Sequence, residues 1–283
     1  MNAFYLTIVV LGVAIQNVAR KAFSDKTNGK GSIFYAALLS FVAMLFFVAL
    51  SEGFRWESGV FPYALGFAVS FAAANVFSTL AVSCGPLSLT ALMVSYSLMI
   101  PTVYGLVFLN DPVSIGLIPG LLLLVVSLFL INKKAADTTI SFKWFIYAFL
   151  ALVGNGMCST TQKMHQVVYG NVFENEFMII ALAIVVLTLC SWSFVTERSD
   201  WKSFAQNGWW MALAGGIANG IVNMLVMLLN SKNFPVSLMF PIISAGGIVI
   251  TFFVSKLIYR EHLTKAQLWG FACGVLSVIL LNI

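Results

Sequence analysis

The chain has 283 residues, of which 60% are hydrophobic and only 9% are charged, and its formal net charge is +5. Soluble domains carry about 25% charged residues, so we expect so apolar a chain to be embedded in lipid. The positive charge then reports membrane topology rather than nucleic-acid binding. The four cysteines form no C-x-x-C pair and are expected to pack as small apolar residues.

Ten apolar runs separated by polar breaks predict ten transmembrane helices, because about 20 apolar residues cross a bilayer. The first run has no basic residue before it and no cleavage site after it, so it is expected to be a membrane helix rather than a signal peptide. The ten predicted runs are Ala3–Ala19, Ser32–Leu50, Phe61–Val82, Leu87–Leu109, Val113–Ile131, Trp144–Met164, Phe177–Phe194, Gly208–Leu229, Pro235–Leu257 and Thr264–Asn282. The expected fold class is an all-α integral membrane protein with no soluble domain.

The charged residues lie in or beside the breaks. All ten acidic residues do so, which argues against a buried carboxylate acting as an ion or proton site. Of the 15 Lys and Arg residues, all but Arg55, Lys163 and Lys232 fall in or beside odd-numbered loops. This asymmetry predicts a multi-pass protein of the cytoplasmic membrane with both termini on the extracytoplasmic side.

The two halves of the chain resemble each other. The segment LIYREHLTKAQLWGFACGVLSVILLN aligns with VFLNDPVSIGLIPGLLLLVVSLFLIN, and other matches keep the same order. The aligned pairs are Asp111 with Glu261, Gly120 with Gly270, Ser127 with Ser277, Gly12 with Gly154, Lys21 with Lys163 and, after a one-residue slip, Asn75 with Asn223. This pattern predicts a five-helix repeat over residues 1–132, a short loop over 133–143 and a second repeat over 144–283. Because five is odd, the copies enter the membrane from opposite sides, an arrangement that supports alternating access.

The acid in each repeated turn has a predicted structural role. Asp111 and Glu261 each precede the last helix of a repeat, where a carboxylate can cap the helix N-terminus. A merely solvated turn fits the sequence equally well.

Ten short-looped helices, duplicated five-helix units and a lysine ending the first run resemble the EamA-like branch of the drug/metabolite transporter superfamily. The resemblance covers the whole chain and is most specific at its end, where an acid, a glutamine and a glycine recur as Glu261, Gln267 and Gly270. The first copy departs from this pattern, with Asp111 as the acid and no glutamine. The resemblance implies a central cavity lined by runs 1, 3, 4, 6, 8 and 9, with runs 5 and 10 packed behind. It also implies transport of small organic solutes, often by efflux.

Polar residues deep within the runs are the candidate binding residues, because a buried polar group marks either a wet cavity or a contact between helices. Asn155, Ser159 and Gln162 recur at helical spacing on one face. The full set of candidate substrate-binding residues is Gln16, Asn17, Asn75, Tyr96, Asn155, Ser159, Gln162, Asn219, Asn223 and Ser244. Both alternatives stay open for each of them.

Proline and glycine within the runs have a separate predicted role. Pro101 and Pro241 each remove a backbone hydrogen bond, and Gly246 and Gly247 permit close helix approach. These four residues are expected to be structural.

The function expected from these patterns is secondary transport of a small neutral or zwitterionic metabolite, amino-acid-like rather than cationic, or of a drug. Without a deep acid, facilitated diffusion or exchange is favoured over proton coupling. A flippase for a lipid or lipid-linked group on the same fold is the alternative, and an integral membrane enzyme is a weaker one, because His165 and His262 form no catalytic cluster. We expect no cofactor, metal or nucleic acid, only a small-molecule substrate and the bilayer as partners, and a monomer or homodimer.

Overall fold

The computed structural model describes residues 2–51, 53–108, 115–131, 141–170, 172–231, 236–260 and 263–280. These residues are almost entirely helical, and none of them lies in a β-strand, which confirms the all-α prediction. Five helical segments are long and apolar enough to cross a bilayer: Phe4–Lys26, Ser32–Leu50, Ser58–Cys84, Glu174–Thr196 and Arg198–Val226. Several long apolar helices therefore indicate a membrane-embedded protein.

Eleven α-helices and three 3₁₀ turns make up the described part of the chain. The α-helices are α1 (Asn2–Lys26), α2 (Ser32–Leu50), α3 (Phe61–Cys84), α4 (Leu87–Ser95), α5 (Met99–Phe108), α6 (Leu117–Ile131), α7 (Phe142–Tyr169), α8 (Glu174–Thr196), α9 (Trp201–Ser231), α10 (Val236–Leu257) and α11 (Lys265–Leu280). The 3₁₀ turns are η1 (Ser58–Val60), η2 (Tyr96–Leu98) and η3 (Arg198–Asp200). Each predicted run overlaps at least one helix, and α1 continues beyond Ala19 to Lys26.

The fourth predicted run is not one continuous helix. It divides into α4, the turn η2 and α5 at the point where Pro101 enters the first turn of α5. Proline has no N–H, and its ring crowds the carbonyl four residues earlier, here that of Ser97. Gly156 of α7 packs against the same carbonyl, since a Cβ at Gly156 would lie 2.7 Å from the Ser97 oxygen. Pro101 therefore lies next to the break between α4 and α5.

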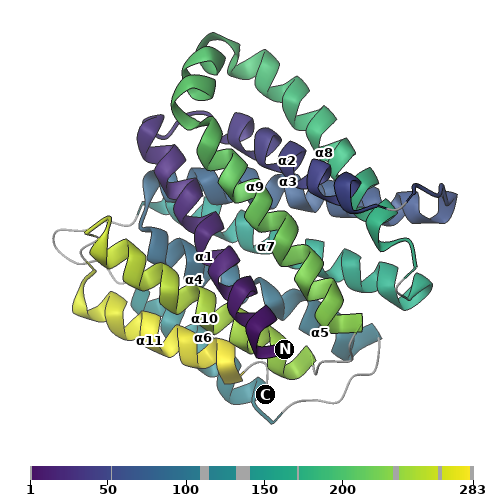
Figure 1. Ribbon diagram of the computed structural model, residues 1–283. Helices are drawn as coiled ribbons and strands as arrows, with labels where there is room; N and C mark the ends of the chain where they lie inside the picture. The colour runs from purple at the N-terminus through teal and green to yellow at the C-terminus, as the bar shows by residue number, and fades with distance from the viewer. Residues whose placement is uncertain are drawn as a thin grey trace.

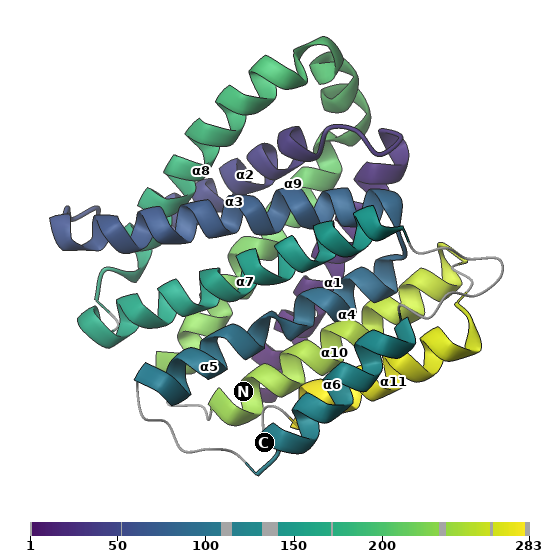
Figure 2. The same cartoon turned by 180° about the vertical axis from the view of Figure 1, so that it is seen from behind.

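The helices pack in long-range pairs that join the two halves of the chain. Helix α1 lies along α9, α3 lies along α7, α6 pairs with α11, and α2 contacts both α8 and α9 (Figures 1 and 2). Apolar side chains form the core clusters of the interior, and large apolar side chains such as Val69, Leu187, Val195 and Leu257 also remain exposed on the outside. An apolar exterior of this kind suits contact with lipid tails.

Two glycines bring α10 close to α1. A Cβ at Gly246 would lie 2.9 Å from Cγ1 of Val10, and one at Gly247 would lie 3.0 Å from Cγ1 of Val13. Both distances are tighter than ordinary van der Waals contact, so a larger residue would push the helices apart. Pro241, the other predicted structural residue of α10, has no described side chain.

Helices α6 and α11 are joined by two reciprocal hydrogen bonds. The hydroxyl of Ser127 on α6 donates to the carbonyl of Gly270 on α11 at 2.7 Å. The hydroxyl of Ser277 on α11 donates to the carbonyl of Gly120 on α6, also at 2.7 Å. Both serines are fully buried, so each bond gives the proton of a buried hydroxyl an acceptor.

Glu197, just after α8, supplies the N-terminal cap of α2. Its Oε2 accepts a hydrogen bond from the backbone N–H of Phe34 at 2.8 Å and its Oε1 from that of Ile33 at 3.4 Å. Gly31, at the N-cap position of α2 itself, offers no side chain. The carboxylate therefore pairs two free N–H groups and opposes the positive end of the helix dipole.

Replacing Glu197 with alanine is expected to lower the free energy of unfolding by about 1–2 kcal/mol. The matched control is Asp200→Ala, which removes an acid of similar exposure from the same loop without touching α2. Fluorescence-monitored thermal unfolding in detergent would compare the two variants. Equal shifts would mean that Glu197 does not stabilise α2.

Candidate functional site

A cavity of about 260 Å³ lies between the helices in the middle of the bundle. Its lining residues come from α1, α3, α4, the turn η2, α7, α9 and α10. These elements correspond to predicted runs 1, 3, 4, 6, 8 and 9, whereas no lining residue comes from α6 or α11. The walls combine apolar side chains with amides and hydroxyls.

Eight of the ten candidate binding residues line this cavity. They are Gln16, Asn17, Asn75, Asn155, Ser159, Gln162, Asn219 and Asn223. Polar residues that lie well inside the predicted apolar runs are thus brought together from α1, α3, α7 and α9. Asn75 and Asn223, which the sequence alignment of the two halves pairs, both lie on the wall of this cavity.

Tyr96 does not line the cavity. It is only 2% exposed and its hydroxyl donates to Oγ of Ser127 on α6 at 2.7 Å. The predicted binding role of Tyr96 is therefore corrected to a structural one, because its polar atom is occupied by a helix contact behind the cavity wall. Ser244, the tenth candidate, lies on α10 with its side chain outside the described part of the structure.

Arg20 is the cavity residue that the sequence reasoning missed. It was counted only as a topology signal, yet it lines the cavity and is 8% exposed. The signal that could have found it is helical spacing, because Val13, Gln16, Asn17 and Arg20 recur at i, i+3, i+4 and i+7. All four line the cavity, so the polar face of α1 continues past Ala19, the predicted end of the helix.

Two neutral amides hold the Arg20 guanidinium. Its Nη1 donates to Oδ1 of Asn17 at 3.3 Å and its Nη2 donates to Oδ1 of Asn75 at 3.2 Å. Asn17 in turn donates from Nδ2 to the hydroxyl of Thr251 on α10 at 3.2 Å, and Asn75 donates to the carbonyl of Phe71. This network fixes Arg20 against α3 and α10, and Nε of Arg20 is buried without a hydrogen-bond partner.

The other side-chain hydrogen bonds of the lining residues join neutral groups. Asn219 donates from Nδ2 to Oε1 of Gln16 at 2.9 Å, and Asn223 donates to the carbonyl and the side-chain oxygen of Asn219. On α7, Asn155 donates to the hydroxyl of Ser97 at 2.7 Å. Gln16, Asn219 and Asn155 both join helices and line the cavity, so for them the two alternatives left open by the sequence are not exclusive.

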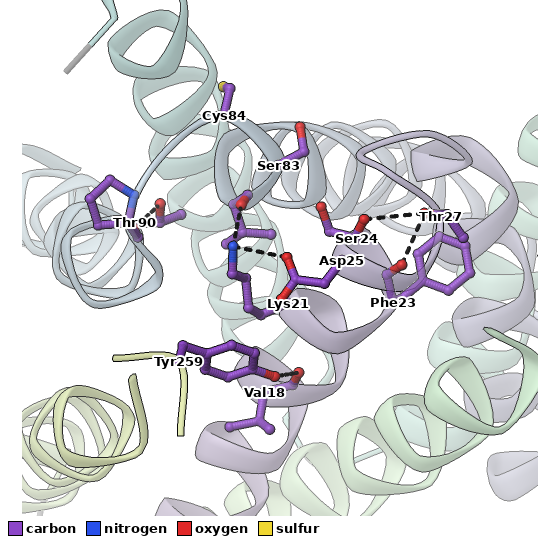
Figure 3. A network of polar contacts seen from close by, with 12 residues as sticks. Val18, Lys21, Phe23, Ser24, Asp25, Thr27, Ser83, Cys84, Thr90 and Tyr259 are labelled. Atoms are coloured by element: carbon purple, nitrogen blue, oxygen red, sulfur yellow. Dashed lines mark hydrogen bonds and ion pairs between the residues drawn. The ribbon is translucent and has the colours of Figure 1, made fainter. Parts of the chain in front are cut away.

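Lys21, the next residue along α1, is in a different environment from Arg20. Its Nζ lies 3.0 Å from Oδ1 of Asp25 and 3.5 Å from the carbonyl of Val82 (Figure 3). Nearby, the hydroxyl of Tyr259 donates to the carbonyl of Val18, which ties the end of α10 to α1 (Figure 3). Lys21 is thus neutralised by an acid outside the cavity, whereas no described carboxylate pairs with Arg20.

The predicted caps Asp111 and Glu261 lie outside the described residues, so their role stays a prediction. Helix α11 does have a side-chain cap that the sequence reasoning overlooked. The N–H of Thr264 donates to Oε1 of Gln267 at 3.0 Å, and the N–H of Gln267 donates to the hydroxyl of Thr264 at 3.3 Å. This reciprocal pair is a capping box, for which T-x-x-Q is the sequence signature.

Within the described residues, no group of three or more His, Cys, Asp or Glu side chains is placed to hold a metal ion. The polar groups that line the cavity are amides, hydroxyls, the thiol of Cys158 and the guanidinium of Arg20.

No protein-family model matches the chain, and no curated protein matches it. Among solved structures, one described as "Crystal structure of protein" is similar with a TM-score of 0.60 and 14% sequence identity. The match covers 95% of this chain and 97% of that chain. At this identity the likeness extends to the fold alone, and it extends over almost the full length of both chains.

Proposed function

We propose that the protein is a secondary transporter that moves a small polar metabolite across the membrane through the central cavity. The observation that carries the proposal is the cavity itself. It gathers polar side chains from α1, α3, α7 and α9 inside a bundle whose exterior is apolar. Polar groups buried in a membrane protein line substrate pathways or join helices, and a cavity of this size suits a small ligand.

The same proposal assigns the chain ten spans in two inverted five-helix repeats, and the helix contacts support it. Gly12 on α1 faces Ala218 and Val222 on α9, whereas Gly154 on α7 faces Ser70 and Ala74 on α3. Gly12 aligns with Gly154, and Ser70 and Ala74 precede Asn75 by the same steps by which Ala218 and Val222 precede Asn223. Exchanging the two halves therefore converts one contact into the other.

The reciprocal bonds between α6 and α11 obey the same exchange. Ser127 and Gly120 align with Ser277 and Gly270, and each serine bonds to the glycine of the other helix. A pseudo-two-fold axis between the halves accounts for this symmetry, and such an axis lets each half adopt the conformation of the other. That exchange is the physical basis of the proposed alternating access.

The architecture agrees with the resemblance to the EamA-like branch of the drug/metabolite transporter superfamily, so we assign the chain to that branch as part of the proposal. The cytoplasmic membrane and extracytoplasmic termini follow from the Lys and Arg asymmetry. That asymmetry persists when Arg20 is left out of the count, because the even-numbered loops still hold only Arg55, Lys163 and Lys232. An amino-acid-like metabolite moving by facilitated diffusion or exchange fits a cavity whose polar lining residues are mostly neutral amides and hydroxyls.

Cys158 offers a direct test of alternating access, because it lines the cavity and is only 7% exposed. A variant with Cys84, Cys190 and Cys273 changed to alanine retains Cys158 as its single thiol. In sealed vesicles of known orientation, a membrane-impermeant thiosulfonate reagent is expected to modify Cys158 when added to either side. A transporter opens its cavity to both sides in turn, so each side gains access.

Modification from neither side would contradict the proposal, because the cavity would then be a closed packing defect. Changing Cys158 to alanine as well removes all thiols and controls for non-specific labelling. Modification only by reagents dissolved in the lipid phase would favour the flippase alternative, since a flippase opens its cavity towards the bilayer.

A further inference from the structure

The charge inside the cavity is unbalanced. Its lining residues comprise one cation, Arg20, and no acid, with every other polar lining residue an amide, a hydroxyl or the thiol of Cys158. Neither ion pair formed by the described residues involves Arg20. A buried charge without a counter-charge is strongly unfavourable in a medium of low dielectric constant. Such a residue in a membrane interior is retained for function more often than for stability.

The guanidinium of Arg20 also has spare hydrogen-bonding capacity. Arginine has five N–H donors, and the described contacts use one on Nη1 and one on Nη2. Nε is buried and has no partner. Outside these contacts, one N–H on Nη1 and one on Nη2 stay free, and such a pair of donors matches the two oxygens of a carboxylate, which arginine binds through parallel charge-assisted hydrogen bonds.

The alignment of the two halves shows that position 20 carries a charge in one half only. Because Lys21 aligns with Lys163, Arg20 aligns with Gln162, which lines the cavity from α7. The two halves thus present a guanidinium in one copy and a neutral amide in the other. The cation is therefore not required by the helix packing that the halves share.

We propose that the transported metabolite carries a single carboxylate, and that Arg20 binds this group within the cavity. This proposal rests on the proposed transport function and names its substrate class. One carboxylate neutralises the cavity charge, whereas a phosphate group with a charge of about −1.5 to −2 at neutral pH would overcompensate it. A cation without a carboxylate would meet Arg20 with nothing to oppose the repulsion.

The other polar lining residues indicate which further groups the substrate carries. Asn155, Asn219 and Gln162 present amide groups, which accept and donate hydrogen bonds to hydroxyl, amino or amide groups. The substrate class is therefore a small monocarboxylic acid with polar substituents, such as a hydroxy acid or an amino acid.

The test compares carboxylic acids with their own amides, which have nearly the same shape but no negative charge. Binding to the detergent-purified protein is measured by thermal shift and by calorimetry for lactate against lactamide, glycerate against glyceramide, and serine against serinamide. We expect at least one acid to stabilise the protein and its amide to bind about 100-fold more weakly. Equal binding of acid and amide throughout would overturn the proposal, as would a response to chloride or inorganic phosphate alone.

Two variants tie the effect to Arg20. Arg20→Gln installs the residue that already occupies the equivalent position in the second repeat, and it is expected to weaken binding of the acid by about 100-fold. Lys21→Gln is the matched control, because it removes a neighbouring charge that is paired with Asp25 outside the cavity. Its affinity for the acid is expected to stay within about threefold of the unaltered protein, because the lost charge is screened by its own partner. An equal loss in both variants would overturn the assignment.

Asn75→Asp gives an independent test, because it places a carboxylate where the Asn75 amide now contacts Nη2 of Arg20. The internal ion pair is expected to raise the unfolding temperature and to abolish binding of the acid. Undiminished binding of the acid by this variant would overturn the proposal.

The binding tests and the Cys158 labelling test can contradict the anion site and the transport function independently of each other. Binding in detergent needs no transport, so an acid that binds at Arg20 without two-sided access to Cys158 would contradict transport and leave the anion site standing. Two-sided access without any preference for acids over amides would contradict the anion site alone.

Discussion

Gly154→Ala is expected to destabilise the protein by about 2–4 kcal/mol, although the change adds only one methyl group. A Cβ at Gly154 would lie 2.7 Å from the backbone N of Ala74 and 2.9 Å from the backbone O of Ser70. These are backbone atoms of α3, so no side-chain rotation can relieve the contact, and α3 and α7 would have to separate. Overpacking of this kind costs about 1–3 kcal/mol or more, and the shared cavity wall would be distorted as well.

Gly66→Ala is the matched control for this prediction. Gly66 lies on α3 in the same interface, but its Cβ would lie 3.4 Å from a methyl group of Thr161, an ordinary contact distance. Alanine favours a helix over glycine by roughly 1 kcal/mol, so this variant is expected to be as stable as the original protein or slightly more so. Thermal unfolding of both variants would measure the difference. Similar behaviour of the two would show that α3 and α7 are not in close contact at Gly154.

Asn75→Leu is expected to destabilise the protein by about 2–3 kcal/mol and to abolish transport. The Asn75 side chain accepts a hydrogen bond from the buried guanidinium of Arg20, and a hydrogen bond to a charged group contributes about 1.5–3 kcal/mol. Leucine has a similar size but no acceptor, so Arg20 would retain Asn17 as its one described side-chain acceptor. The guanidinium would then lose its fixed position and one of the hydrogen bonds that offset the cost of burying its charge.

The same change at another cavity asparagine, Asn223→Leu, serves as the comparison. Asn223 donates to Asn219 within α9 and has no hydrogen bond to a charged group in the described structure. We expect its stability effect to be about 1 kcal/mol, the value of an ordinary hydrogen bond. A double-mutant cycle of Asn75→Leu with Arg20→Gln would measure the coupling directly, and a coupling energy near zero would contradict the role given to Asn75.

Helix content and position could be predicted from the sequence because lipid imposes a simple length and polarity rule on each span. The break at Pro101 illustrates the limit of that rule. Proline is apolar, so Pro101 leaves the hydropathy of the predicted run unbroken. In the structure, its missing N–H and the crowded carbonyl of Ser97 coincide with a 3₁₀ turn that divides the helix into two. The first run is predicted to end at Ala19, because the charged residues Arg20 and Lys21 are typical of the edge of a span, whereas α1 continues to Lys26.

The candidate binding residues that could be predicted correctly are those whose grouping depends on a single helix. Asn155, Ser159 and Gln162 could be grouped by helical spacing, and all three line the cavity. Tyr96 could not be placed, because its partner Ser127 lies on another helix and only the tertiary structure brings the two together. Arg20 carried two conflicting signals, a topology rule that places basic residues outside the membrane and a helical phase that places this one in the cavity.

The most direct test of the central claim, that the cavity is the path of a small polar metabolite, is an untargeted uptake measurement. Proteoliposomes containing the protein would be incubated with a mixture of small metabolites, and their contents compared by mass spectrometry with those of Ser159→Trp, which fills the cavity from α7. Leu187→Trp, on the exposed face of α8, is the control for adding an indole ring. The account predicts that at least one polar metabolite enters with the unaltered protein and with Leu187→Trp but is excluded by Ser159→Trp. No uptake by the unaltered protein, or equal uptake by all three, would contradict it.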